Sequence, residues 1–120
     1  MTPDAAALEI VDTVRSGDTT ARAVVEAALA RIAQHDRLLG AFTAVLADRA
    51  LDQAEAVDAA VRSGKAGPLA GVPFAAKNLY DIKGLPTRAG SRINRTRLPA
   101  SADATLIDRL TQVSIRYLVR

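Results

Sequence analysis

Apolar residues recur at every third or fourth position through most of the first half of the chain, a spacing that predicts three amphipathic helices. The first begins near Thr2, a suitable N-cap, and ends at Gly17. The second begins near Thr20 and is broken at Gly40, and the third covers about 48–62. Their apolar stripes contain Leu8, Val11 and Val14, then Val25, Leu29 and Ile32, then Leu51, Ala54, Val57, Ala60 and Val61.

Three short apolar runs are expected to form strands. Residues 41–46 are apolar and partly β-branched, which suits a strand buried on both faces. Residues 72–76 form a second run. Because Pro73 cannot donate to a ladder, this strand should begin at a sheet edge or beside a bend. Residues 113–119 form the last run, and the pattern as a whole is that of an α/β protein whose helices come first.

The second and third runs are separated by a segment of different character. Turn residues recur from 78 to 99 with little periodicity, which predicts an ordered but irregular stretch. A short helix should follow, capped by Ser101 or Asp103 and continuing through Leu110.

Composition narrows the possible functions. A chain of 120 residues with 49% hydrophobic and 24% charged residues can form one compact domain. It contains no cysteine, which excludes disulfide scaffolds, thiolate zinc sites and cysteine nucleophiles. The only histidine is His35, so a multi-histidine metal site is excluded as well. Aromatic residues, at 3%, are too few for a protein that stacks the bases of a single strand.

The charge is divided unevenly along the chain. Residues 1–66 carry ten acidic and seven basic residues, whereas residues 67–120 carry three acidic and nine basic residues. A basic half indicates either an anionic partner or a face that lies against something else.

No segment for membrane insertion or export is visible in the sequence. No apolar run reaches the roughly 20 residues of a membrane helix, and the start lacks a signal-peptide pattern, so we expect a cytoplasmic chain that uses no membrane.

Lys77 is the residue whose position most suggests chemistry. It ends the apolar run 72–76, so its ammonium should lie near the edge of a core. Burial disfavours the charged form of lysine, and a neutral amine held at a strand end can act as a general base. The alternative is a lysine whose stem packs while its head reaches water.

The sequence around Lys77 resembles a known family. The string Gly-Pro-Leu-Ala-Gly-Val-Pro-Phe-Ala-Ala-Lys-Asn (67–78), followed by Asp81, Gly84, Thr87 and Gly90-Ser91, is similar to the amidase signature family around its catalytic lysine. Residues 88–95, Arg-Ala-Gly-Ser-Arg-Ile-Asn-Arg, resemble the subfamily that hydrolyses carboxybiuret-type ureides and small amides. The likeness continues to about Leu110.

This resemblance implies a fold and a mechanism. The chain would be the N-terminal part of an amidase domain, with a helical lead-in over about 1–40. An α/β portion over about 41–120 would hold a partial mixed β-sheet flanked by helices. Family members use a Ser–cis-Ser–Lys arrangement, in which a neutral lysine accepts a proton relayed through one serine while a second serine attacks the amide carbonyl. Only Lys77 of that machinery is carried over to this sequence, and no metal or organic cofactor is implied.

The sequence departs from the family pattern in its serines. None of Ser16, Ser63, Ser91, Ser101 and Ser114 stands in a glycine-rich segment like that of the family, and Ser91 resembles a loop former. The last ten residues also differ from the family's usual strand, which suggests a truncated or frame-shifted product that is inactive alone. Strands severed from their neighbours would leave unpaired edges, so we expect marginal stability, self-association or association with another subunit.

Several alternatives remain open from the sequence. The chain could be an amide hydrolase segment acting on a small amide or ureide, or part of a glutamine-dependent amidotransferase subunit. It could also be a small basic module that docks an anionic partner through residues 83–97, or an inactive fragment.

Some single residues also have two possible roles. Asp81 either orients Lys77 or begins a turn. His35 and Asp36 form a surface pair at a helix end. The cluster of Arg88, Arg92, Arg95 and Arg97 either binds an anion or is a solvated loop.

Overall fold

The computed structural model describes residues 5–119 of the chain as four α-helices, three strands and one 3₁₀ helix. In chain order these are α1 (Ala7–Ser16), α2 (Ala21–Leu39), β1 (Ala44–Val45), α3 (Ala47–Arg62), β2 (Pro73–Ala76), η1 (Arg92–Thr96), α4 (Thr105–Val113) and β3 (Ile115–Val119). The expected α/β class, with helices leading, is confirmed.

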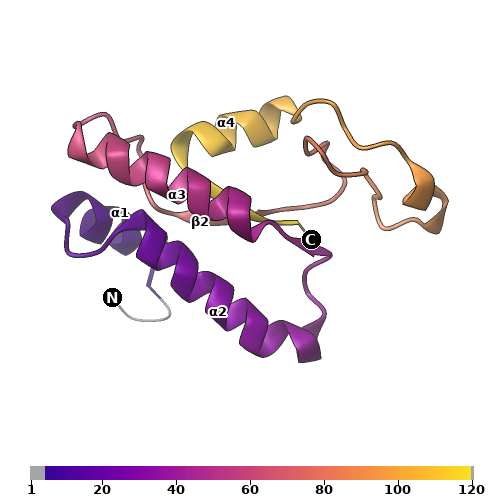
Figure 1. Cartoon of the computed structure of the whole chain (residues 1–120), viewed down its shortest axis with the longest axis horizontal. Coiled ribbons are helices and arrows are strands. Elements are labelled where there is room, and N and C mark those ends of the chain that lie inside the picture. Colours follow the sequence, from indigo (N-terminus) through magenta and orange to yellow (C-terminus); the bar gives the residue numbers. More distant parts are fainter. Residues whose placement is uncertain (1–4, 120) are drawn as a thin grey trace.

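The three strands form one small mixed sheet in the order β1-β3-β2. β3 lies in the middle, antiparallel to β1 and parallel to β2, with an irregular register between Phe74 and Ala75. β2 is therefore an edge strand within the described chain, and its first residue is Pro73. This confirms the prediction that a strand containing Pro73 begins at a sheet edge, because proline has no amide hydrogen to donate. α3 and α4 both contact β3, so the sheet is flanked by helices as expected (Figure 1).

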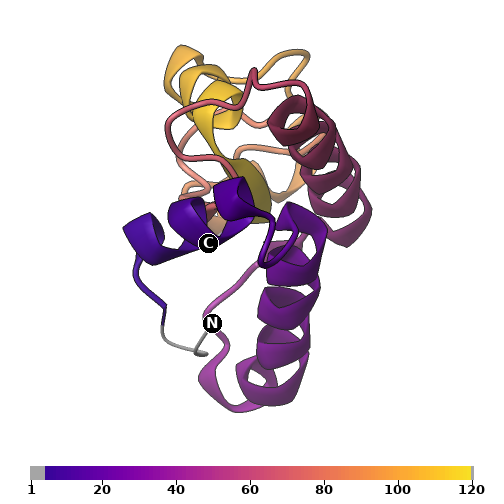
Figure 2. The ribbon, with the colours of Figure 1, turned by 90° about the vertical axis from the view of Figure 1, so that its left-hand side faces the viewer.

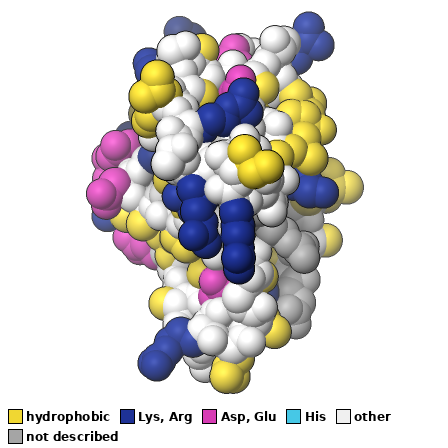
Figure 3. Space-filling model, turned by 90° about the vertical axis from the view of Figure 1, so that its right-hand side faces the viewer, with side chains coloured by type: hydrophobic (Ala, Val, Ile, Leu, Met, Phe, Trp, Pro, Cys, Tyr) yellow, Lys and Arg dark blue, Asp and Glu magenta, His cyan; other side chains and the backbone are white. Residues whose placement is uncertain are grey.

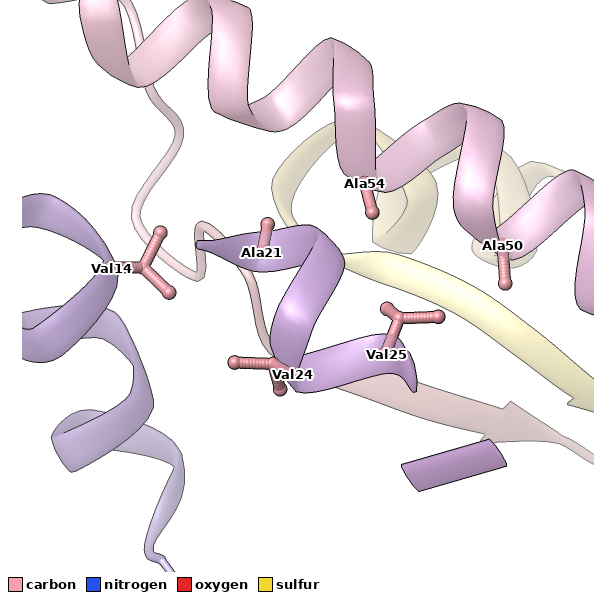
Figure 4. Close-up of a cluster of buried hydrophobic side chains, with 6 residues drawn as sticks. All are labelled: Val14, Ala21, Val24, Val25, Ala50 and Ala54. Carbon is pink, nitrogen blue, oxygen red and sulfur yellow. The ribbon is translucent and has the colours of Figure 1, made fainter. Parts of the chain in front are cut away.

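The three N-terminal helices share one core. α2 lies along α3, and Figure 2 shows that the axis of α1 runs across that of α2. The side chains buried between them are small, which allows the helix backbones to approach closely. They are Val14, Ala21, Val24, Val25, Ala50 and Ala54 (Figure 4).

The ends of α1 and α2 follow local sequence signals. The Thr20 hydroxyl accepts a hydrogen bond from the amide of Ala23, as an N-cap does. Gly17 and Gly40 end the two helices in the left-handed conformation, with φ values of 84° and 56°. A further cap comes from another helix, since the Asp58 carboxylate in α3 accepts hydrogen bonds from the amides of Ala21 and Arg22 at 2.7 and 3.2 Å.

Two expectations from the first half of the chain need correction or fall outside the described residues. Thr2 lies outside them, and α1 begins at Ala7 without a side-chain cap. The strand expected over 41–46 is wrong in length and burial, because β1 has two residues and Val45 is 44% exposed. Ala41 instead belongs to the turn after α2, where its amide donates a hydrogen bond to the Asp36 carboxylate, and pairing with β3 begins only at Ala44.

Two expectations for the C-terminal third are also wrong. Neither Ser101 nor Asp103 caps α4, because its N-cap is Ala104 and the Asp103 carboxylate accepts from the Lys83 amide at 2.8 Å. α4 also runs past Leu110 to Val113, so the last strand begins at Ile115.

The segment between β2 and α4 extends away from the helices. It is irregular apart from η1 and forms one end of the long axis of the molecule (Figure 1). The molecule measures 47 × 31 × 20 Å. Its radius of gyration of 14.8 Å exceeds the roughly 13.6 Å expected for a compact domain of this length. Within residues 5–119 no helix has the length and apolar character needed to cross a bilayer.

Candidate active site at the end of strand β2

Lys77 directly follows the last residue of β2. Ala76, which precedes it, is buried and pairs with Val119 of β3, so the sheet sets the position of the lysine backbone. The carbonyl of Lys77 accepts a hydrogen bond from the amide of Tyr80 at 3.2 Å, which turns the chain immediately after the strand. The lysine therefore lies at a strand end, as the apolar pattern predicts.

The burial expected for Lys77 is not observed. The residue is exposed, because the cavity beside it opens to solvent and none of the described elements covers it. Within the described residues, the lysine is thus anchored at a strand end while its side chain stays open to water.

Lys77 lines a cavity of about 580 Å³, within the size range of small-molecule sites. The walls come from Thr43, from residues 77–79 that follow β2, and from the distant loop 88–95. Ten residues line the cavity, and none of them is acidic: Thr43, Lys77, Asn78, Leu79, Arg88, Ala89, Gly90, Ser91, Arg92 and Arg95.

Asn78 attaches the distant loop to the strand end. Its side-chain oxygen accepts a hydrogen bond from the amide of Arg88 at 3.2 Å, and its backbone carbonyl accepts one from the amide of Ala89 at 2.9 Å. In the motif 67–78 Asn78 is only the last residue, and no role is predicted for it from the sequence. The signal was present, since asparagine in a segment rich in turn residues commonly bonds nearby backbone groups.

Ser91 has the structural role expected of it. Its hydroxyl accepts a hydrogen bond from the amide of Ile93 at 3.2 Å and so caps η1. Ala89, just before it, has a φ of 47°, the only positive value among the described residues other than glycine. This strained backbone lies at the cavity wall, where such conformations are often found near functional groups.

Asp81 forms a turn contact, which is the second of its two predicted roles. Its carboxylate accepts a hydrogen bond from the hydroxyl of the buried Thr87, and its carbonyl accepts one from the amide of Ala104 at 2.8 Å. Both contacts hold the irregular segment together. Asp81 does not line the cavity beside Lys77.

The basic cluster predicted from the sequence is divided by the fold. Arg88, Arg92 and Arg95 line the Lys77 cavity, whereas Arg97 lines a second, smaller cavity together with Asp81 and Asp103. His35 and Asp36 both lie in the last turns of α2, where His35 is exposed and the Asp36 carboxylate accepts a hydrogen bond from the amide of Ala41 beyond the helix end.

A lysine at the end of an edge strand, beside a cavity and within a helix-flanked mixed sheet, is the arrangement expected of the amidase signature fold. The model of the Amidase family matches residues 23–120, and the chain belongs to this family. The resemblance seen around Lys77 is thereby confirmed.

Relatives within the family include two kinds of named subunit. The chain is 50% identical over 104 residues to 1-carboxybiuret hydrolase subunit AtzE of Pseudomonas sp. strain ADP, covering 86% of this chain and 23% of that one. It is 53% identical over 88 residues to a subunit of the glutamyl-tRNA(Gln) amidotransferase of Anaeromyxobacter dehalogenans, covering 72% of this chain and 18% of that one. The chain thus spans about a fifth to a quarter of the length of these relatives.

Solved structures agree with this assignment. A vestigial protein complex described as revealing the evolutionary origins of an s-triazine catabolic enzyme matches with a TM-score of 0.91 and 45% identity, covering 96% of this chain and 25% of that one. A bacterial aryl acylamidase of the amidase signature family matches with a TM-score of 0.85 and 28% identity, covering 96% and 24%.

Proposed function

We propose that this chain supplies Lys77 as the general base of an amide C–N hydrolase that works by a Ser–cis-Ser–Lys mechanism. The observation that supports this most strongly is the position of Lys77 at the end of β2, on the wall of a small-molecule cavity, in a chain of the Amidase family. The relatives named for hydrolysis of 1-carboxybiuret and for aryl acylamide cleavage support an amide or ureide substrate.

In this mechanism the lysine amine must be neutral at rest. It accepts a proton through the serine of the cis peptide while the nucleophilic serine attacks the carbonyl carbon. The protonated lysine then returns this proton to the substrate nitrogen as the C–N bond breaks, which leaves the acyl group bound to the nucleophilic serine. Water then attacks the acyl-enzyme and releases the acid. The hydroxyl of Ser91 already caps η1, so we infer that both catalytic serines belong to the part of the family's length that these 120 residues do not span.

The same part of the family's length would also complete the surroundings of Lys77. Covering the open cavity would remove water from the amine and favour its neutral form. The 120-residue chain alone is therefore expected to be inactive, and a fluorophosphonate probe for activated serines should not label it. Labelling of any of its five serines would contradict this.

A chimera tests the role of Lys77. This chain would replace the segment that it matches in 1-carboxybiuret hydrolase subunit AtzE, and consumption of 1-carboxybiuret would be followed. Removing a general base should reduce kcat by about 10²–10⁴-fold in Lys77→Ala. Lys65→Ala is the matched control, because Lys65 is an exposed lysine that lines a different cavity from Lys77. Full activity of Lys77→Ala would overturn the proposal.

A second candidate is a segment of a glutamine-dependent amidotransferase, which the 53% identity to the amidotransferase relative favours. Both named relatives are subunits, and this supports association of the chain with another polypeptide. A second chimera, in which the chain replaces the matching segment of the amidotransferase relative, would be tested for glutamine hydrolysis. This would separate the two candidates, since only the chimera with the correct partner segment should recover activity.

A further inference from the structure

Arg49 joins the layer of helices α1, α2 and α3 to the irregular segment 77–104. It is the third residue of α3, and its Nη2 atom donates a hydrogen bond to the backbone carbonyl of Lys83 at 3.0 Å. Gly84, the next residue, has a φ of 86°, which favours glycine, and a Cβ there would lie 3.6 Å from the same nitrogen. The guanidinium group therefore lies against the backbone of residues 83–84.

This contact lies where the two arms of the irregular segment are joined. The amide of Lys83 donates to the Asp103 carboxylate at 2.8 Å. The amide of Gly84 donates to the carbonyl of Ala100 at 2.9 Å. The loop 88–95 lies between these two arms in the chain, so a shift of the joined arms relative to α3 would displace the loop.

The loop 88–95 forms part of the wall of the Lys77 cavity, and Thr43, shortly before α3 in the chain, forms another part. The arginines of the loop carry the same charge as Lys77. Lys and Arg side chains gather near the middle of this end of the molecule (Figure 3). Because like charges repel, they favour a wider cavity unless the loop is held from elsewhere. The hydrogen bond from Arg49 holds the arms of the loop to the helix that follows Thr43.

The position of Arg49 is unfavourable for stability alone. Its Nη1 atom is buried and finds no acceptor among the residues that the structure describes. A buried donor without an acceptor costs free energy, and a positive charge in the first turn of a helix opposes the helix dipole. A side chain that carries both costs calls for an explanation other than stability.

From these observations we propose that Arg49 is a positioning residue, which holds the loop 88–95 at a fixed distance from α3 and so sets the width of the Lys77 cavity. This rests on the proposed amide hydrolysis for the reaction that the cavity serves. Arg49 does not line the cavity and acts through the backbone of Lys83. The backbone of Lys77 is placed separately, by the pairing of β2 with β3. Substitution of Arg49 should therefore weaken substrate binding more than the chemical step.

The coupling is tested first in the 120-residue chain, without any reaction. Arg49→Met keeps an unbranched side chain but removes every donor. The lost hydrogen bond and the removed unpaired donor should offset one another, so the midpoint of urea unfolding should not fall. Amide hydrogen exchange, followed by NMR, should become about tenfold faster at Gly84 and Ala89, because the arms and the loop open locally. Exchange in α2 should stay unchanged.

Arg49→Lys and Arg62→Met are the controls. A lysine can still donate to the carbonyl of Lys83, so Arg49→Lys should restore most of the protection. Arg62 is an exposed arginine in the last turn of the same helix, and its loss should leave exchange at Gly84 and Ala89 unchanged. A lower midpoint for Arg49→Met would indicate a merely structural role and overturn the proposal. Unchanged exchange at both amides in Arg49→Met would overturn it as well.

Turnover by the AtzE chimera separates this proposal from the proposed function. Arg49→Met should raise KM for 1-carboxybiuret about tenfold while kcat changes less than about threefold, because the loop moves and Lys77 does not. A fall in kcat with an unchanged KM would overturn the positioning role. If Lys77→Ala remains active while Arg49→Met still raises KM, the mechanism fails and the positioning role stands. If Lys77→Ala is inactive and Arg49→Met leaves KM unchanged, the positioning role fails and the mechanism stands.

Discussion

The helical layer formed by α1, α2 and α3 and the irregular segment 77–104 are held together by different forces. In the helical layer six buried valine and alanine side chains form a shared core. In the segment 77–104 only Ile82 and Thr87 are buried, and Ile93 is 90% exposed. The segment is held by hydrogen bonds that Asn78, Asp81 and Asp103 make with other residues.

This difference indicates that one region mainly stabilises the fold and the other mainly positions the residues of the cavity. Apolar burial stabilises the helical layer against unfolding, since its contribution grows with the area removed from water. The segment 77–104 contributes one large buried side chain, that of Ile82, to a smaller cluster with Ala76 and Ile107, and its hydrogen bonds fix polar and charged groups at the cavity wall. Substitutions in the helical layer should therefore lower the free energy of unfolding more than substitutions in the segment 77–104, whose effects should stay local.

The largest loss is expected where the helical layer meets β2. Gly71 has a φ of 83°, and a Cβ there would come within 2.8 Å of the Val14 Cγ2 atom, which belongs to the buried core. Gly71→Ala combines backbone strain with overpacking and should lower the free energy of unfolding by about 3 kcal/mol. Urea unfolding followed by circular dichroism measures this, and Gly64→Ala, where a Cβ meets nothing within 4 Å, isolates the strain alone. Equal losses in both variants would show that the contact with Val14 is unimportant.

The two regions can be compared directly by truncating one apolar side chain in each and measuring the change in the free energy of unfolding. Val25→Ala removes a fully buried side chain of the helical core and should cost about 2 kcal/mol. Ile93→Ala removes a larger side chain from the exposed loop and should change stability by less than about 0.5 kcal/mol. The same urea titration compares them, and a larger effect of Ile93→Ala would show that the loop is buried in solution, for example by self-association.

The capping of α2 from α3 should have an intermediate effect. Asp58→Ala leaves the amides of Ala21 and Arg22 without their side-chain acceptor and should cost about 1 kcal/mol. Asp58→Asn keeps one acceptor oxygen and should recover part of the loss. Identical unfolding midpoints for the parent and Asp58→Ala would contradict the capping role.

The smallest effect on stability is expected for Asn78→Ala. The partly exposed amide of Arg88 loses its side-chain acceptor but can bond to water, so the cost should be about 0.5 kcal/mol. The local effect should be clearer, with faster hydrogen exchange at Arg88 and unchanged exchange in α2. Faster exchange throughout the helices would instead place Asn78 in the structural core.

How far the sequence predicted this structure depended on how local each signal was. The ends of α1 and α2 at Gly17, Thr20 and Gly40 were predicted correctly, because capping involves residues within one turn of each other. The strand over 41–46 and the cap at Asp103 were wrong, because Asp36 and Asp103 bond to backbone groups outside the helices in which they were considered. Self-association, marginal stability and the catalytic role of Lys77 stay predictions.

The sequence by itself determined the helical layer, the basic character of the second half and the family, since periodicity, charge and a conspicuous motif are all properties of residues close together in the chain. Only the tertiary structure decided that Lys77 is exposed, that Arg97 is separated from the other arginines, and that Arg92 and Arg95 share a wall with the lysine. The physical reason is that these arrangements depend on hydrogen bonds across ten or more residues, such as that from Arg88 to Asn78, and no local pattern encodes which partner such a group will find.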